Sequence, residues 1–179
     1  MVGLMQRKSP EVLQERQNPP GLCSVATQLR FDGRFLNLKS TSFMGAYTAR
    51  SGKLSGDFSI KAQKDRGLGP IPEGTYWIFP AQIWTRSPTE NWLADHTQFG
   101  ALLWAGWGHH RITIHEMPDT QTYGRGGFFL HGGLHPGSSG CIHITGTGDS
   151  EMDRFPADLQ KTVGGFPACA ILLKVAYPK

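Results

Sequence analysis

A histidine and a cysteine ten positions apart are the residues of this chain best suited to chemistry. His131 ends the apolar run 128–130, and Cys141 follows a Ser-Ser-Gly turn. A thiol is a strong nucleophile near neutral pH only as the thiolate, which a neighbouring imidazole provides by taking the proton or stabilising the anion. The glycines and Pro136 between them favour a tight reversal that returns Cys141 to His131. The pair predicts a cysteine acyltransferase, with the amides of Gly140 and Cys141 directed at a developing oxyanion.

Two other interpretations of this segment remain open. Six of the seven histidines fall between His109 and His143, and zinc donors are available at His131, His135, Cys141 and His143. A proline and several glycines argue against a helix here, and residues 131–143 contain no carboxylate, so we expect neither a metal nor another cofactor. The second alternative is that Cys141 is a buried structural thiol, although a polar, glycine-rich turn precedes it.

The remaining histidines and cysteines are expected to be structural. His109, His110 and His115 fall in strand or loop positions without a catalytic part. An odd number of cysteines without regular spacing does not indicate a disulfide framework. We therefore expect Cys23 and Cys169 to pack as small apolar residues.

The composition predicts a mainly β fold. A chain of 179 residues with 23 glycines, 12 prolines and only 18% charged residues is typical of short strands joined by many turns. We expect one domain over residues 21–179, preceded by an N-terminal lead-in at residues 1–20 that is flexible or a short helix. The charge of +4 is scattered without basic runs, which argues against nucleic acid as a partner.

Alternating apolar residues and turn signals locate the expected strands. Residues 24–31 and 34–38 read as a hairpin around Asp32-Gly33, a type I′ turn sequence. Further strands are expected at residues 42–49, 75–80, 99–107, 111–115, 127–131 and 168–176. Asp149 is a plausible cap for a helix from Ser150 to Asp153 or further. Pro156 either interrupts this helix or starts a second one that runs through Lys161.

No apolar stretch is long enough for a signal sequence or a membrane span. We therefore expect a protein that is made in the cytoplasm without a signal peptide and does not insert into a membrane. Any export then uses a route without a cleaved leader.

The same residues resemble a known family. His131-Gly132 followed by Gly137-Ser138-x-Gly140-Cys141-Ile142 resembles the signature of the L,D-transpeptidase (YkuD-like) cysteine enzymes. It is most similar to the L,D-transpeptidase-like effectors of type VI secretion systems. The resemblance extends over roughly residues 30–175, with further matches at residues 69–78, at Trp107-Gly108-x2-Arg111 and at residues 126–133.

The resemblance implies roles for individual residues. Cys141 is the nucleophile and His131 its general base, while the N–H groups of Gly140 and Cys141 border the oxyanion hole and Ser138 and Ser139 shape the turn. Substrate contacts are implied for Arg125, Gly132, Gly133 and His143. For Arg125 the implied partner is a substrate carboxylate, with a surface arginine as the alternative. His143 departs from the pattern, because the broad superfamily tends to carry arginine there and the effector branch an acidic residue.

The resemblance also implies a fold and a function. The fold is a YkuD-like β-sandwich or barrel with a short helical insert after the cysteine. The substrate is the peptidoglycan stem peptide, whose terminal D-alanine is removed by water (L,D-carboxypeptidase) or exchanged with a D-amino acid acceptor (L,D-transpeptidase). An immunity protein and a secretion-system component are the expected partners, with type VI secretion and action in the target-cell periplasm. A zinc-dependent wall hydrolase and a non-catalytic wall-binding β domain remain as alternatives.

Overall fold

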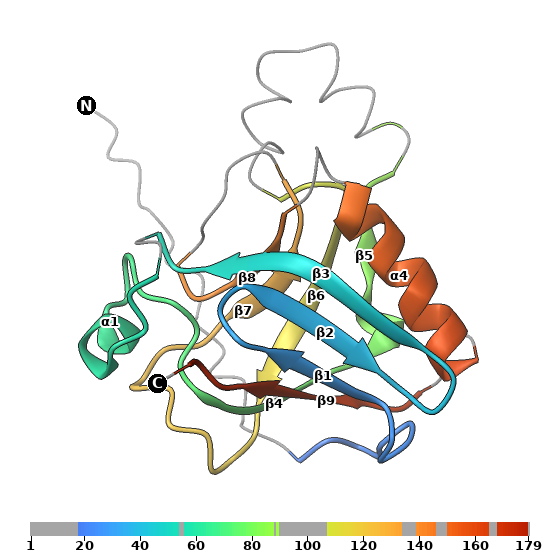
Figure 1. Ribbon diagram of the computed structural model, residues 1–179, viewed down its shortest axis with the longest axis horizontal. Coiled ribbons are helices and arrows are strands. Elements are labelled where there is room, and N and C mark those ends of the chain that lie inside the picture. Colours follow the sequence, from blue (N-terminus) through green and yellow to red (C-terminus); the bar gives the residue numbers. More distant parts are fainter. Residues whose placement is uncertain are drawn as a thin grey trace, which may run out of the picture.

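The computed structural model describes residues 18–53, 56–87, 89, 107–133, 139–145, 150–164 and 168–178. Figure 1 shows a mainly β structure with one longer helix beside it. The elements are β1 (Gln28–Phe31), β2 (Phe35–Lys39), β3 (Met44–Ser51), α1 (Ile60–Lys64), β4 (Gly74–Ile78), η1 (Pro80–Gln82), β5 (Trp84–Thr85), β6 (His110–Glu116), β7 (Phe128–His131), β8 (Ile142–Ile144), α4 (Ser150–Val163) and β9 (Ile171–Val175).

The strands form a closed barrel. Their order is β4-β9-β1-β2-β3-β8-β7-β6-β5, and an additional pairing of β4 with β6 closes eight of them, leaving β5 attached to β6. The β1–β9 and β7–β8 pairs are parallel, whereas the other pairings within the sheet are antiparallel. Closure removes the free edges of the eight strands. The expected β-sandwich or barrel class is confirmed.

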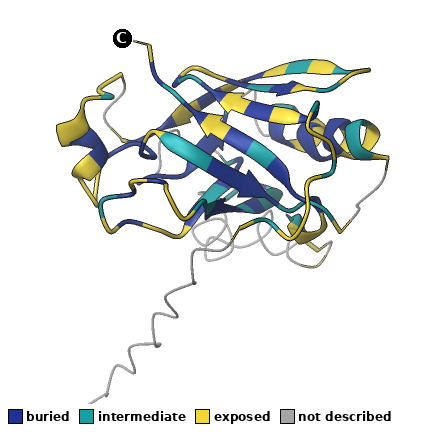
Figure 2. Ribbon diagram, turned by 90° about the horizontal axis from the view of Figure 1, so that it is seen from below, coloured by how far each residue is buried: buried dark blue, intermediate teal, exposed yellow. Residues whose placement is uncertain are grey.

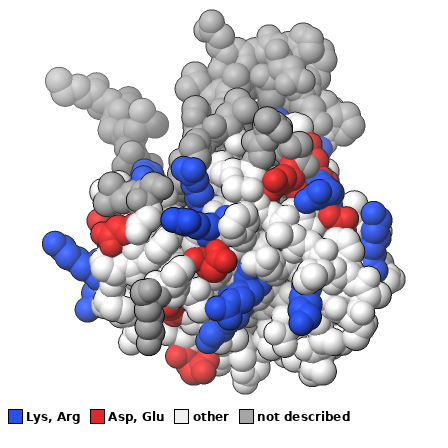
Figure 3. Space-filling view, viewed as in Figure 1, with Lys and Arg blue, Asp and Glu red and all other residues white. Residues whose placement is uncertain are grey.

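Alternation along the strands fills the barrel (Figure 2). β1 and β2 bury every second residue, as the two-residue period of a strand requires. The helix α4 packs against β3 and β6 and adds Met152, Phe155 and Leu159 to the same core. The hydroxyl of Tyr47 on β3 donates to Asp158 of α4 at 2.8 Å, which fixes the helix against the strand. Lysines and arginines lie interspersed with acidic residues on the face in Figure 3.

The helical insert after Cys141 is confirmed, but its course differs from the expectation. Pro156 neither ends a first helix nor starts a second one, since α4 continues through it from Ser150 to Val163. Burial of Phe155 and Leu159 on either side of the proline compensates for the one backbone hydrogen bond that proline cannot donate. Asp149, the expected cap, lies outside the described residues, as do residues 1–17 and 99–106.

The first hairpin turns one residue later than expected. Asp32 donates its N–H to Phe35 O at 3.2 Å, so Gly33 and Arg34 are the central residues. Gly33 has φ +96° and Arg34 does not share the positive φ of a type I′ turn. The Asp32 carboxylate accepts from the N–H groups of Arg34 and Phe35, and this side-chain bonding selects the turn. The short elements α1, β5 and β8 had no counterpart in the expectation.

A disulfide joins Cys23 to Cys169, so the prediction that both are unpaired apolar residues is wrong. Their Cα atoms are 4.8 Å apart although 146 residues separate them in sequence. The segment before β1 runs parallel to the start of β9, with Cys23 N–H donating to Ala170 O and Ala170 N–H to Gly21 O. Spacing along the chain carries no sign of this contact, which exists only once β9 has joined the barrel.

Among the described residues, no helix combines the length and the apolar character needed to cross a bilayer.

We expect the disulfide to contribute strongly to stability, because it closes a very long loop in the unfolded chain. The double variant Cys23→Ser/Cys169→Ser, made on a Cys141→Ala background that removes thiol exchange, should lose about 2–5 kcal/mol of unfolding free energy. Urea unfolding of both proteins measures the difference. Reductant should reproduce the loss in the disulfide-containing parent and leave the double variant unchanged. Equal stability of parent and variant would contradict the assignment.

Candidate active site

Strand register aligns a row of side chains on the outer face of the barrel. Trp84 pairs with Arg111, Arg111 with His131, His131 with His143, and His143 with Arg50. Directly paired residues in adjacent strands point to the same side of a sheet. The neighbours Ile112, Leu130 and Ile142 are fully buried in the core, so these five side chains occupy the opposite face. We call them the histidine row.

Cys141 lies beside this row. It directly precedes Ile142, which pairs with Leu130, so strand alternation places Cys141 on the same face as His131 and His143. Among the described cysteines, Cys141 is the one outside a disulfide, because Cys23 and Cys169 are bonded to each other. The side chains are well covered, with exposures of 4% for Cys141, 2% for His131 and 1% for His143. The structure therefore brings the predicted nucleophile and base to adjacent strands.

Two imidazoles hold the Gly132-Gly133 turn. Nδ1 of His131 donates to Gly132 O at 2.6 Å, and Nε2 of His143 donates to Gly133 O at 3.0 Å. Since a carbonyl only accepts, Nδ1 of a neutral His131 carries the proton and Nε2 carries the lone pair. The rings are stacked with centroids 5.1 Å apart and an interplanar angle of 23°. The predicted substrate residues Gly132, Gly133 and His143 thus shape the turn that orients His131.

Trp107 is a site residue to which the sequence analysis assigned no role. Its ring centroid lies 5.1 Å from that of His131 and 5.6 Å from that of Phe129. The tryptophan therefore packs against the imidazole at a tilt of 54°, and Trp107 and His143 together restrict rotation of that ring. The family match at Trp107-Gly108-x2-Arg111 was the one sequence signal for this residue, but it did not indicate which residues the tryptophan contacts.

The turn before Cys141 requires glycine at position 140. Gly140 has φ +83°, and a Cβ there would lie 2.5 Å from the Phe128 ring and 2.7 Å from Nη2 of Arg125. The backbone therefore rests directly on these two side chains. Ser139 donates its hydroxyl to Gly67 O, which ties the same turn to the segment after α1. Ser138 lies outside the described residues.

Arg125 donates to the protein's own backbone, and its expected role as a ligand for a substrate carboxylate stays a prediction. Nη1 donates to Gln63 O and Pro70 O, both at 2.6 Å, and Nη2 donates to Gly69 O at 3.0 Å. The side chain is only 7% exposed and lies against the Phe128 ring. A buried guanidinium that uses its N–H groups in this way fixes the chain around it.

The charge of Arg125 also acts on the thiol. Burial lowers the pKa of the guanidinium, and nearby groups that become anions, including Tyr76, Tyr177, Asp65 and Cys141, act in the opposite direction. The interaction is mutual, because a cation near a thiol favours the thiolate. Arg125 therefore supports both the position of the turn and the anionic state of Cys141.

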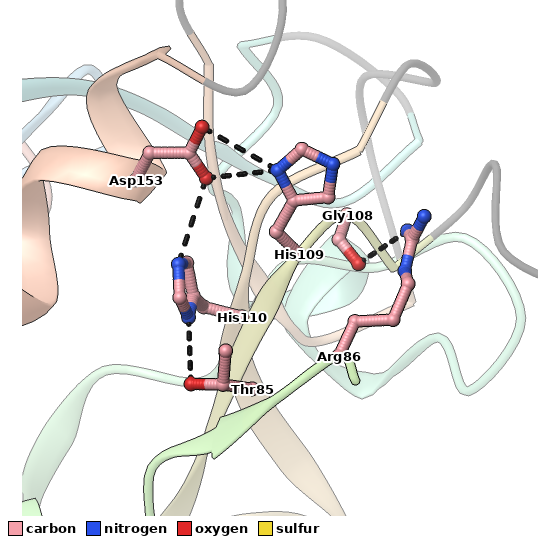
Figure 4. Close-up of polar contacts among 6 residues, drawn as sticks. All are labelled: Thr85, Arg86, Gly108, His109, His110 and Asp153. Carbon is pink, nitrogen blue, oxygen red and sulfur yellow. Dashed lines mark hydrogen bonds and ion pairs between the residues drawn. The ribbon is translucent and has the colours of Figure 1, made fainter. Parts of the chain in front are cut away.

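A polar cluster next to β6 anchors the segment that carries Trp107 (Figure 4). Asp153 of α4 accepts from Nδ1 of His109 at 3.1 Å and lies 3.6 Å from Nε2 of His110. The Thr85 hydroxyl hydrogen-bonds Nδ1 of His110 at 3.0 Å, and Arg86 donates to Gly108 O at 2.6 Å. These contacts connect α4 and β5 to the segment around Gly108, the residue after Trp107. These contacts give His109 and His110 partners within the protein. His115 also has one, because its Nε2 hydrogen-bonds Gln82.

The described residues contain no group of three or more His, Cys, Asp or Glu arranged to hold a metal ion. His135, one of the four donors considered for zinc, lies outside the described residues.

A family model described as the Tlde1 domain matches residues 45–163, well over half of the chain. The chain belongs to the Tlde1 domain family. The matched range runs from β3 to the end of α4 and includes Cys141 and the whole histidine row. Tlde1 domains occur in type VI secretion effectors that target peptidoglycan, a setting that fits an antibacterial enzyme delivered into a target cell. No curated protein matches the chain.

We expect Gly140→Ala to be more damaging than an alanine at a glycine with similar φ but open surroundings. Gly164 has φ +72° and nothing within 4 Å of a Cβ, so it isolates the cost of the left-handed backbone. Gly140→Ala should lose about 1–3 kcal/mol more unfolding free energy than Gly164→Ala, because the added methyl overlaps Phe128 and Arg125. Urea unfolding of the two variants measures this. Equal losses would show that the turn does not rest on those side chains.

Proposed function

We propose that residues 21–179 form a single catalytic domain that acts on peptidoglycan stem tetrapeptides as a cysteine L,D-carboxypeptidase and L,D-transpeptidase. The observation that carries this proposal is the hydrogen bond from Nδ1 of His131 to Gly132 O, on the face of the barrel that also holds Cys141. It leaves Nε2 as the basic atom of a ring packed against both Trp107 and His143. Peptidoglycan is the target of the Tlde1 family, and the L,D chemistry comes from the resemblance of the cysteine motif.

The first half-reaction transfers the acyl group to the enzyme. Nε2 of His131 takes the Sγ proton of Cys141, and the thiolate attacks the carbonyl carbon at the L-centre of meso-diaminopimelate. The amides of Gly140 and Cys141 donate to the resulting oxyanion. When the tetrahedral intermediate collapses, the C–N bond to D-alanine breaks and the imidazolium returns its proton to the departing amine. D-alanine leaves and a thioester on Cys141 remains.

The second half-reaction releases the acyl group. Water, deprotonated by Nε2 of His131, attacks the thioester carbon and yields a tripeptide, whereas the amine of a D-amino acid yields an exchanged tetrapeptide. In both cases the C–S bond breaks and Sγ recovers the proton held by His131. Each outcome consumes the tetrapeptide donors that cross-linking requires, which accounts for toxicity in a cell without an immunity protein.

The disulfide supports action outside the cytoplasm. Disulfides form and persist in oxidising compartments such as the bacterial periplasm and are rare in the cytosol. The Cys23–Cys169 bond therefore fits a protein whose working compartment is the target-cell periplasm, where peptidoglycan lies. Delivery by a type VI system also fits the family of the chain.

Purified protein incubated with defined tetrapeptide muropeptides should release D-alanine, and mass spectrometry should detect the tripeptide or, with added D-amino acid, the exchanged product. Cys141→Ala and His131→Ala should each reduce release by at least about 10³-fold, since each removes one half of the nucleophile–base pair. Arg30→Ala is the control, because Arg30 is exposed on β1, a strand not adjacent to β7 or β8.

Inhibitors separate the alternatives. Iodoacetamide should abolish activity and a chelator should not, whereas a zinc hydrolase requires the opposite. Binding to sacculi without any change in muropeptide mass would indicate a non-catalytic wall-binding domain. Full activity of a folded Cys141→Ala protein would overturn the cysteine mechanism.

A further inference from the structure

We propose that Arg111 forms a subsite for the terminal carboxylate of the D-amino acid that leaves the substrate, an inference that rests on the proposed function. Arg111 lies directly opposite His131 in the antiparallel β6–β7 pair. Cβ atoms of such pairs are about 5 Å apart and point to the same face. A group bound to Arg111 is therefore a neighbour of the imidazole.

Three aromatic rings hold the guanidinium. Its central carbon lies 4.9 Å from the ring centroid of Trp84, 5.5 Å from that of Trp107 and 5.8 Å from that of Phe129. Aromatic faces attract a cation and restrict its plane, but they do not use its N–H groups as a carboxylate does. The half-buried side chain is thus fixed in position with its hydrogen-bonding edge still available.

Two arginines near the site differ from Arg111 in using their N–H groups, whereas Arg50, on the far side of His143 from His131, is exposed. Arg125 and Arg86 donate to backbone carbonyls of the protein itself. For Arg111, no ion pair or side-chain hydrogen bond is found with the described residues, whose ion pairs involve Asp153 and Asp158. A partly desolvated, oriented guanidinium without an anion matches the planar, two-oxygen geometry of a carboxylate.

The order of strands decides which carboxylate it takes. Cys141 leads into β8, His131 ends β7 and Arg111 is on β6, so the histidine lies between the thiol and the arginine. The same histidine protonates the departing amine, which places the leaving group on its side of the thiol. The carboxylate of the departing D-alanine is separated from that amine by a single carbon. It therefore extends toward Arg111.

The test compares two substrates that differ only at the terminal group. Tetrapeptide with a free C-terminal carboxylate should be cleaved by the parent enzyme with a kcat/KM about 10–100-fold above that of the C-terminal amide. Arg111→Met should lose that factor on the carboxylate and change little on the amide, so that the preference disappears. Arg111→Lys, which keeps the charge without the fork, should recover part of it.

A matched control and a binding measurement complete the design. Arg30→Met removes an exposed arginine on β1, on a strand not adjacent to β6, β7 or β8, and should retain the full preference. Calorimetry on a Cys141→Ala background should show tetrapeptide binding weakened about 10–100-fold by Arg111→Met, with unchanged thermal unfolding as the check on folding.

The outcomes separate the two proposals. If Cys141-dependent release occurs and Arg111→Met keeps the carboxylate preference, the subsite is wrong while the proposed function stands. If the parent enzyme releases no D-alanine and binds the acid and amide peptides equally, both are overturned. Loss of release together with an Arg111-dependent preference in binding would overturn the reaction and support the subsite.

Discussion

The parallel pairing of β7 with β8 is the constraint on which the candidate site depends. It sets His131 beside His143 and, through alternation, brings Cys141 to the same outer face. A slip of one residue would turn every side chain of one strand to the other side of the sheet, so His131 would enter the apolar core in place of Leu130. Burial of Leu130 and Ile142 disfavours this slip, because both side chains are completely buried in the barrel interior. Packing of the core thus sets the strand register, and the register sets the positions of the polar side chains on the outer face.

Two supports keep the ends of these strands in place. After β7, the rings of His131 and His143 donate to the consecutive carbonyls of Gly132 and Gly133. The two imidazoles together therefore fix the backbone of this turn. Before β8, Arg125 gathers three carbonyls from residues 63–70 and lies under Gly140. A buried cation is costly unless its donors are satisfied, and here the backbone of a distant segment satisfies them. Loss of the guanidinium would leave those carbonyls without donors and the turn without support, so its effect on the thiol would be positional as well as electrostatic.

The mainly β fold and the residue pair could be predicted because both follow from local pattern, whereas the sandwich or barrel was implied by the family resemblance. Alternation located most strands, and a histidine and a cysteine around a glycine-rich turn indicated the dyad. β8 was not predicted, since the three residues Ile142–Ile144 are too few to show a period. The disulfide and the contacts of Arg125 depend on segments that meet only in the folded barrel, 146 residues apart for the cysteines and 55 to 62 for Arg125 and its carbonyl partners. Sequence chemistry identified Arg125 as a cation near the site and missed that its partners are the protein's own carbonyls.

Arg125 and Arg111 supply the positive charge that an arginine at position 143 would otherwise bring. His143 is therefore compatible with an anionic substrate, although it departs from the family pattern. His143 stacks on His131, so a guanidinium in its place would lie against the imidazolium that forms when the thiol is deprotonated, and like charges at that distance disfavour each other. A neutral imidazole avoids this repulsion and still donates to Gly133 O. The cationic contribution is met instead from two positions, Arg125 beneath the nucleophile turn and Arg111 across the β6–β7 pair. Neither guanidinium stacks on His131, so the base can gain a proton in the first step while a fixed positive charge remains near both the thiolate and the leaving group.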